Sequence, residues 1–224
     1  MKKRKWWMLI LVTSLLAGLG CGQELEPFGP GSMDLTWKVA PLGCDAGEVE
    51  SVEIRLENDR NVHVEQVDCQ ARGVRIEEIA PGRYDLTIEG ASASGTPTFD
   101  ARLDSVFIRP DSPVFVGPVE LEAIPAEVQI YWRPDDWEIC EVEGLEEVEV
   151  AVFDGAYHRV HLSMWNCRAG IANVAGLPAG QYYFRVRTEN QESKFEGVRA
   201  LDVGWGQQAE LDIDLIQVDA GARR

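Results

Sequence analysis

The chain has 224 residues, of which 45% are apolar, 26% charged and 8% aromatic. This ordinary globular composition excludes a disordered or collagen-like chain and predicts one or two domains. The 38 Asp and Glu residues outnumber the 21 Lys and Arg residues, which gives a net charge of −17. Such an acidic protein repels nucleic-acid phosphates and anionic lipid headgroups, so neither nucleic acid nor a basic membrane-binding patch is expected.

The first twenty residues are typical of a secretory signal peptide. A basic segment, Lys2 to Lys5, precedes an uncharged and mostly apolar segment from Trp6 to Leu19. A helix that spans a bilayer needs roughly twenty apolar residues, so this segment is too short to be one. The pattern therefore predicts export, with residues 1–20 as the signal peptide.

Residues 16–21, LAGLGC, resemble the lipobox of bacterial lipoproteins, in which small residues precede a cysteine that is acylated and becomes the new N-terminus. Gly20 fits this pattern, whereas Gly18 stands where the family usually has leucine. The resemblance implies a lipid anchor on Cys21; the alternative is an ordinary cleaved signal peptide. Enterobacterial lipoproteins with an aspartate after the cysteine stay at the inner membrane. Gly22 stands at that position here, which implies the outer membrane.

The rest of the chain contains two similar segments. Identical residues recur at offsets of 95 to 98 positions: Trp37 and Trp132, Cys44 and Cys140, His63 and His161, Cys69 and Cys167, Gly82 and Gly180, Tyr84 and Tyr182. Two copies of one structural unit are the simplest account of this recurrence. The sequence thus predicts a flexible Gly- and Pro-containing tether over residues 21–32, repeats over 33–123 and 124–218, and a tail over 219–224.

The remaining cysteines are expected to form disulfides, because export takes them to an oxidising compartment. If Cys21 carries lipid, four cysteines are left, and four allow three connectivities. The repeat selects the pairs Cys44–Cys69 and Cys140–Cys167. No pair has the C-x-x-C spacing of a zinc site, so a metal is not expected.

Apolar residues alternate with polar ones throughout both repeats, a pattern that predicts half-buried antiparallel strands. The clearest runs are 35–39, 52–56, 84–88, 128–132, 148–152, 160–164, 182–186 and 211–215. No amphipathic helix longer than two turns is expected. Short strands at this spacing predict an all-β fold of two tandem antiparallel β-sandwiches.

Residues 79–84, IAPGRY, and 177–182, LPAGQY, are similar to the turn and strand of transthyretin-like and carboxypeptidase-regulatory-like domains. In that motif the glycine opens the strand and the tyrosine points to the core. The layout also resembles bacterial lipoproteins built from such repeats. The resemblance implies Ig-like or prealbumin-like sandwiches, which are mostly accessory modules.

No catalytic or phosphate-binding motif stands out, since GxSxG, SxxK and GxGxxG are all absent from the sequence. His161 and Ser163 are two residues apart on one predicted strand, roughly 7 Å apart at the Cβ atoms, with no orienting acid at a recognisable spacing. His158 and His161 are three apart and should point to opposite faces of a strand. Neither a cofactor nor a metal is therefore expected, although acidic loops leave calcium binding open.

Tyr183, Arg185 and Arg187 are expected on the outward side of the strand 182–186, where the first repeat has two acids and a threonine. Tyr and Arg are favoured in protein interfaces, so these residues form a candidate partner-binding face. The alternative is a strand that pairs with local acids or packs on the sister repeat.

Three further residues are candidates for partner binding. His161 and its counterpart His63 precede the second cysteine of each repeat by six residues, and the alternative for both is a solvent-facing histidine on an edge strand. Trp137 and Trp205 fall in predicted loops, where they either contact a partner or seal the end of a sandwich.

Together these features predict a non-catalytic binding or structural module at the bacterial cell envelope. Its partner would be an envelope protein or a glycan, and its oligomeric state stays open. The alternatives are a weakly marked hydrolase and a transthyretin-like carrier with an apolar pocket for a small ligand.

Overall fold

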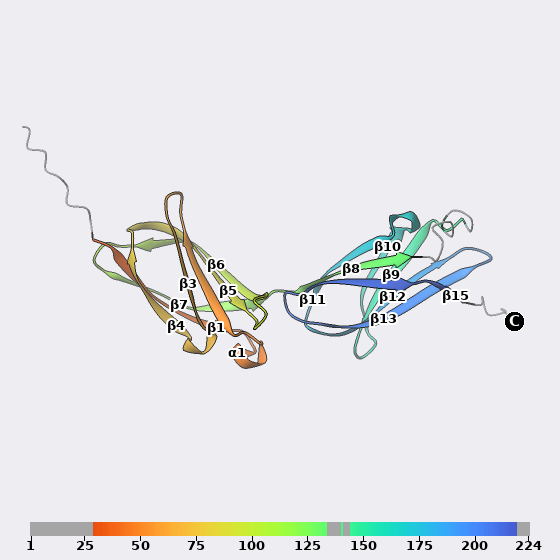
Figure 1. The fold of residues 1–224 in the computed structure, drawn as a ribbon, viewed down its shortest axis with the longest axis horizontal. Coiled ribbons are helices and arrows are strands. Elements are labelled where there is room, and N and C mark those ends of the chain that lie inside the picture. Colours follow the sequence, from red (N-terminus) through yellow and green to blue (C-terminus); the bar gives the residue numbers. More distant parts are fainter. Residues whose placement is uncertain (1–28, 134–139, 141–143, 219–224) are drawn as a thin grey trace, which may run out of the picture.

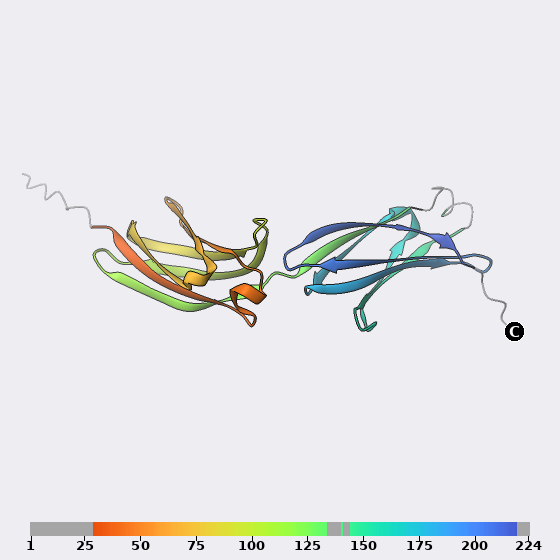
Figure 2. The same cartoon turned by 60° about the horizontal axis from the view of Figure 1, so that its bottom comes forward.

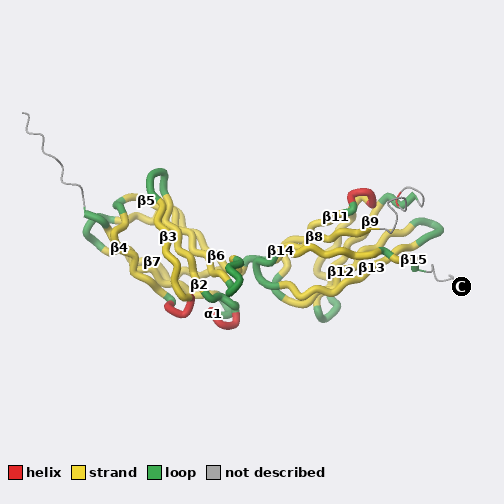
Figure 3. Tube along the Cα trace, viewed as in Figure 1, coloured by secondary structure: helices red, strands yellow, loops and turns green. Residues whose placement is uncertain are grey.

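The computed structural model describes residues 29–133, 140 and 144–218, and these residues form almost only strands. The strands gather in two groups that lie end to end along the long axis of the molecule (Figures 1 and 2). Figure 3 shows how little helix interrupts them. The predicted all-β fold is confirmed. No helix of the described residues is long and apolar enough to cross a membrane.

The first group consists of β1 (Gly31–Val39), α1 (Gly43–Ala46), β2 (Ser51–Glu57), β3 (Val62–Asp68), the short 3-10 helix η1 (Cys69–Ala71), β4 (Gly73–Ile79), β5 (Gly82–Ala91), β6 (Pro97–Ile108) and β7 (Pro113–Ala123). The strand order is β3-β2-β5-β6-β7-β1-β4. Strands β6 and β7 pair only at Phe99 with Ala123 and at Asp100 with Glu122. The sheet therefore folds over at this point into two layers.

The second group consists of β8 (Ala126–Arg133), β9 (Glu147–Asp154), β10 (Arg159–Asn166), the 3-10 helix η2 (Cys167–Ala169), β11 (Ile171–Leu177), β12 (Gly180–Glu189), β13 (Lys194–Val203), β14 (Gln208–Asp214) and β15 (Ile216–Gln217). One sheet has the order β10-β9-β12-β13-β15 and the other the order β11-β8-β14. Apart from the two-residue β15, each strand of this group has its counterpart in the first, as the internal repeat predicts.

The sheets are mixed rather than purely antiparallel, which differs from the expectation. Strand β1 pairs in parallel with β7, and β8 pairs in parallel with β14. In both groups these are strands from opposite ends of the repeat. Two strands that are so far apart in the sequence are not joined by a hairpin. Whether they run parallel or antiparallel is therefore set by the path of the whole chain between them.

Each group encloses its own apolar core, built from the alternating residues of its strands. Aromatic side chains of the two cores include Trp37, Tyr84 and Phe99 in the first and Trp132, Tyr182 and Phe184 in the second. These aromatic residues are all less than 9% exposed, and the equivalent tryptophans and tyrosines occupy equivalent places. The two groups thus have similar, separately filled apolar interiors.

The first strand begins at Gly31, so the last two residues assigned to the tether belong to β1. Gly31 pairs with Ile79, and a Cβ atom there would lie 2.3 Å from the carbonyl oxygen of Arg109. Only glycine allows this close approach. The glycine at position 31, which the sequence pattern assigned to a flexible tether, is therefore required for close packing of the backbone.

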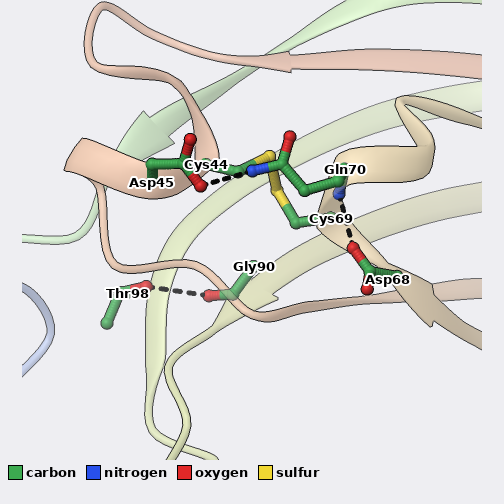
Figure 4. The surroundings of a disulfide bond; sticks show 7 residues. All are labelled: Cys44, Asp45, Asp68, Cys69, Gln70, Gly90 and Thr98. Carbon is green, nitrogen blue, oxygen red and sulfur yellow. Dashed lines mark hydrogen bonds between the residues drawn. A yellow bond between two sulfur atoms is a disulfide. The ribbon is translucent and has the colours of Figure 1, made fainter.

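Both predicted disulfides are present. Cys44 in α1 bonds to Cys69 in η1 with a Cα–Cα distance of 6.0 Å, and Cys140 bonds to Cys167 in η2 at 5.9 Å. Figure 4 shows the first bridge and the hydrogen bonds beside it. The side-chain amide of Gln70 donates to the Asp45 carboxylate at 2.6 Å.

Equivalent tyrosines close a turn in each core. Tyr84 donates its hydroxyl hydrogen to the carbonyl of Ala80 at 2.8 Å, and Tyr182 donates to that of Pro178 at 2.8 Å. Burial raises the pKa of the Tyr182 hydroxyl, with a smaller effect from the Asp154 charge. The hydroxyl therefore remains a neutral donor. Sandwich domains commonly use such a tyrosine to fasten the turn before a strand.

Replacing either tyrosine by phenylalanine is expected to reduce the free energy of unfolding by about 1–2 kcal/mol, because a partly buried carbonyl loses its donor. Urea unfolding of Tyr84→Phe and of Tyr182→Phe would measure the effect. The change should appear as a shift in the midpoint with an unchanged slope. Two variants as stable as the natural chain would mean that the hydroxyls do not fasten the turns.

Candidate partner-binding face

The predicted aromatic and basic residues of β12 lie together on one surface. Tyr183 pairs with Phe153, Arg185 with Ala151, and Arg187 with Glu149 on the neighbouring strand β9. Paired residues project on the same side of a sheet, and this side faces away from the core of the second group. We call it the outer face of the five-stranded sheet. Its further members on β10 and β13 are Leu162, Met164, Glu196, Val198 and Ala200.

Two tyrosines stack at one end of the outer face. The rings of Tyr157 and Tyr183 have centroids 4.7 Å apart and an interplanar angle of 15°. Tyr157 is 67% exposed and has a φ of 63°, in the left-handed region. The hydroxyl of Tyr157 raises the pKa of Tyr183, so the Tyr183 ring remains neutral at physiological pH. The pair offers a flat aromatic surface with a polar edge.

The turn between β9 and β10 holds Tyr157 in this position. The carboxylate of Asp154 accepts hydrogen bonds from the backbone N–H groups of Ala156 at 2.9 Å and His158 at 2.8 Å. These bonds, the one to His158 above all, hold the pKa of Asp154 below its ordinary value, against a smaller opposing effect of desolvation. Asp154 is therefore a positioning residue for the stacked pair.

Acid is expected to loosen this turn. A carboxyl whose pKa is lower in the folded than in the unfolded state stabilises the fold above the unfolded value, and the effect is lost as the pH falls through the folded value. For Asp154 that window lies below about pH 4. Titration of the Tyr157 and Tyr183 ring signals by NMR should show the stack separating there, and Asp154→Ala should show it separated at neutral pH. Unchanged ring signals in that variant would contradict the positioning role.

Arg185 joins the polar and apolar parts of the outer face. Its guanidinium carbon lies 5.1 Å from the centroid of the Phe153 ring, and its Nη2 donates to the Glu149 carboxylate at 2.9 Å. Beneath it Ala151 is fully buried. Arg187 forms an ion pair with Glu189, which raises the pKa of the guanidinium. The charges of this region are thus balanced locally, and the Arg185 guanidinium also lies over an aromatic ring.

The same face of the first group is highly charged. The matching positions of β2 and β5 carry Glu53, Arg55, Glu57, Asp85 and Glu89, and those of β6 carry Asp100, Arg102 and Asp104. Arg55 approaches Glu53 and Glu57 at 3.9 and 3.8 Å, and Arg102 approaches Asp85 at 3.7 Å. Apart from the exposed Val62 and Val64 on its edge strand β3, the first group therefore carries a solvated, acidic outer face. The second group carries a neutral outer face that is rich in aromatic and aliphatic groups.

The structure corrects the orientation predicted for β10. Val160, Leu162 and Met164 were expected in the core, but they are 51%, 46% and 55% exposed. The residues between them, His161 and Ser163, pair with buried residues of β9. They therefore project toward the space between the two sheets. Alternation of apolar and polar residues shows that a strand has two different faces, but it does not show which face packs against the core. Strand β10 lies at the edge of its sheet, and its apolar face remains exposed to solvent.

His161 therefore does not belong to the outer face. Its Nε2 atom lies 3.0 Å from the Ser163 Oγ atom, which also accepts a hydrogen bond from the Trp165 ring at 2.8 Å. The two side chains meet, although the Cβ spacing of alternate strand residues suggested a wide separation. Its counterpart His63 lies 4.0 Å from the Glu65 carboxylate. The two histidines thus occupy equivalent places with different neighbours.

Trp205 lies where the two groups meet. Its ring centroid is 6.1 Å from that of Phe99, at the end of the first core, and it packs partly buried against that core. The next residue, Gly206, donates its N–H to the carbonyl of Ile124 at 2.7 Å. Gly206 has a φ of 63°, and a Cβ atom at this position would lie only 1.9 Å from the carbonyl oxygen of Pro97, so only glycine fits here. This contact favours the sandwich-sealing alternative for Trp205.

Trp137 and Cys21 lie outside the described residues, so their predicted roles remain predictions. The described residues contain no group of three or more His, Cys, Asp or Glu side chains that could hold a metal ion. A hollow of about 610 Å³ lies between β6 and β7. Asp100, Arg102, Glu120 and Glu122 line it. Ala101, Leu103, Pro118 and Val119 also line it, so charged and apolar groups share its surface.

Comparison with known proteins gives limited similarity. No family model and no curated protein matches the chain. The TIE protein of Bacillus anthracis is similar to 85% of this chain at 12% identity, with a TM-score of 0.40. A B repeat unit of the collagen-binding surface protein of Staphylococcus aureus is similar to 84% at 11% identity, with a TM-score of 0.31, and the chain covers 97% of it. The streptococcal ancillary pilin is similar to 82% at 8% identity, with a TM-score of 0.28 and 68% covered.

The chain spans only 34% of the TIE protein. Likenesses at this level of identity and TM-score do not assign a function, and the outer face has to be judged on its own chemistry.

Proposed function

We propose that this protein is a non-catalytic binding module of the bacterial cell envelope, held there by a lipid on Cys21, and that the outer face of its second repeat contacts a partner protein. One observation carries the proposal. Equivalent positions in two similar sandwiches bear charged residues in the first and Phe153, Tyr183 and Val198 in the second. The shared fold does not require these apolar groups, which leaves contact with a partner as their function.

The composition of the outer face favours a protein over a glycan. Interfaces between proteins are enriched in aromatic residues, Met and Arg and are depleted of free charge at their centre. The outer face combines the stacked tyrosines with Met164, Leu162 and Val198, and its arginines are already paired with local acids. A sugar site would rather present aromatic rings with free hydrogen-bonding groups beside them. Aliphatic side chains that are about half exposed, such as these, are better suited to contact with a partner protein than with a glycan.

The location belongs to the same proposal. The lipobox-like segment before Cys21 supports acylation, and Gly22 supports delivery to the outer membrane. The disulfides support an oxidising compartment, since such bonds are rare where thiols are kept reduced. A short tether would then keep both sandwiches close to the membrane, with the first repeat nearer to the lipid.

A serine hydrolase is the second candidate, because His161 and Ser163 are within hydrogen-bond distance. A nucleophilic serine also needs an orienting group on the histidine and donors for an oxyanion. Among the described residues no carboxylate bonds to His161, and the Ser163 hydroxyl oxygen is engaged by Trp165. Reaction with a fluorophosphonate probe, lost in Ser163→Ala, would establish this alternative. We expect no such reaction.

Photo-cross-linking in living cells tests the proposed surface. A benzoylphenylalanine at Val198, which is 53% exposed on the outer face, should form an adduct with a second protein. The same group at Arg102, the matching position of the first repeat, is the control and should form none. Adducts from both positions, or from Arg102 alone, would contradict the proposal. Protein adducts absent from both, with retention on isolated cell-wall glycan, would replace the protein partner by a glycan.

A further inference from the structure

The two repeats end in equivalent edge strands that both expose apolar side chains. Strand β3 closes one side of the first group and β10 closes the same side of the second group, each bonded to one neighbour within its sheet. Val62 and Val64 of β3 are 55% and 45% exposed, and Leu162 and Met164 of β10 are 46% and 55% exposed. Natural proteins usually protect such edges with charge, proline or a covering segment.

Each edge also presents unpaired backbone groups. Two backbone hydrogen bonds at the strand ends fix which residues face the sheet: Cys167 N–H to Glu146 O at 2.9 Å, and Cys69 N–H to Glu50 O at 3.0 Å. Bonded and non-bonded residues alternate along an antiparallel strand. The amides of Leu162 and Val64 therefore point away from their sheets. An added strand would find donors and acceptors ready at both edges.

The two edge strands themselves carry opposite charges. Strand β10 contains Arg159 and no Asp or Glu, whereas β3 contains Glu65 and Asp68 and no Lys or Arg. Pairing β10 with β10 or β3 with β3 would bring like charges together. Pairing β3 with β10 brings opposite charges together and is favoured.

We propose that copies of this chain associate edge to edge, with β10 of one copy adding to β3 of the next as an antiparallel strand. The occupant of each exposed edge is thus a second copy of the chain. Because the two edges differ, the contact is heterologous and either extends or closes into a ring. The pairing does not depend on the proposed function, since the protein alone is sufficient to test it.

The side chains suit one register. With Val64 opposite Leu162, the apolar residues of both strands meet on one face of the joined sheet, as cross-strand pairs do. The same register sets Glu65 opposite His161 on the other face. A slip by one residue would place apolar groups against the polar face, so the exposed rows themselves select the register.

Sedimentation velocity of the full-length chain, purified in a non-ionic detergent with micelles in excess, tests the pairing. The natural chain should associate as its concentration rises. The association should weaken at about 1 M salt, where the screening length falls to ~3 Å. Val64→Lys and Leu162→Lys should each weaken the association about tenfold or more, because lysine places charge within a desolvated contact. Phe115→Lys, at a 78% exposed position of β7, is the matched control and should behave as the natural chain.

Mixing the Val64→Lys and Leu162→Lys variants distinguishes the pairing of β3 with β10 from any other mode of self-association. Each variant keeps one intact edge, so equal amounts of Val64→Lys and Leu162→Lys should form one-to-one dimers and nothing larger. Near-UV circular dichroism and a non-reducing peptide map check their fold. Met164→Lys on the same edge replaces Leu162→Lys if that spectrum changes. A natural chain that stays monomeric, a mixture that stays monomeric, or variants that associate like the natural chain would each overturn the proposal.

Discussion

Replacing Cys44 and Cys69 together by alanine is expected to reduce the free energy of unfolding of the first repeat by about 3.5 kcal/mol. The bridge closes a loop of 25 residues, and its loss lets the unfolded chain sample many more conformations. The bridge also ties α1 to η1 beside a buried core. Replacing Cys140 and Cys167, which are 27 residues apart, should have an effect of similar size on the second repeat.

Urea unfolding followed by tryptophan fluorescence would measure both effects. Because Trp37 lies in the first core and Trp132 in the second, each pair of substitutions should move mainly the transition of its own repeat. The chain with all four cysteines intact, under oxidising conditions, is the control. A variant that unfolds at the urea concentration of the natural chain would show that the bridge contributes little to stability.

Giving the second repeat the surface of the first should weaken partner binding strongly. Tyr183→Asp with Val198→Arg introduces the residues found at the matching places, Asp85 and Arg102. The substitution removes the tyrosine stack and places charge at the centre of the outer face. A hot-spot residue at the centre of an interface contributes about 2 kcal/mol or more, so the loss of one such residue alone should lower the affinity by about thirtyfold or more.

Adduct yield from a photo-cross-linker at Ala200, an exposed neighbour of Tyr183 on the outer face, provides the readout. Asp85→Ala with Arg102→Ala in the first repeat is the matched control and should leave the yield unchanged. Thermal unfolding should show both double variants folded, because all four side chains lie on outer faces. An unchanged yield in the Tyr183→Asp variant would mean that the outer face does not contact the partner.

The sequence alone predicted most of the fold for a physical reason. Period-two alternation over runs such as 52–56 and 182–186 marks strands with one buried face, and those residues are buried as expected. Repeated cysteines and tyrosines then aligned the two units, because a duplicated fold keeps the residues that fasten it. The disulfide pairing followed from that alignment.

The candidate site was only half predictable. Tyr183, Arg185 and Arg187 follow from the alternation of one strand, but Phe153 and Val198 belong to neighbouring strands, and only the register brings them together. Asp154 and Gly155 predict a tight turn between the two strands. The positive φ of Tyr157, on which its stacking depends, has no signal in the sequence. Comparison of matching positions between the repeats was the available signal, since it sets apolar residues against charged ones.

Two features of tertiary packing lay beyond the sequence for the same reason. Alternation in β10 indicated two different faces but not which one the core covers, so the apolar row was assigned to the wrong side. Trp205 lies in a loop of the second repeat, and its contact with Phe99 of the first depends on how the two units meet. Both features arise from contacts between segments far apart in the sequence.

Hydroxyl-radical footprinting in intact cells would test directly whether a partner covers the outer face of the second repeat. If it does, Tyr157 and Tyr183 should be oxidised several times more slowly in the envelope than in the purified protein. Phe115, which is 78% exposed on the first repeat, should react equally in both. Equal oxidation of the two tyrosines in cells and in solution would show that the outer face is free and would contradict its role in binding.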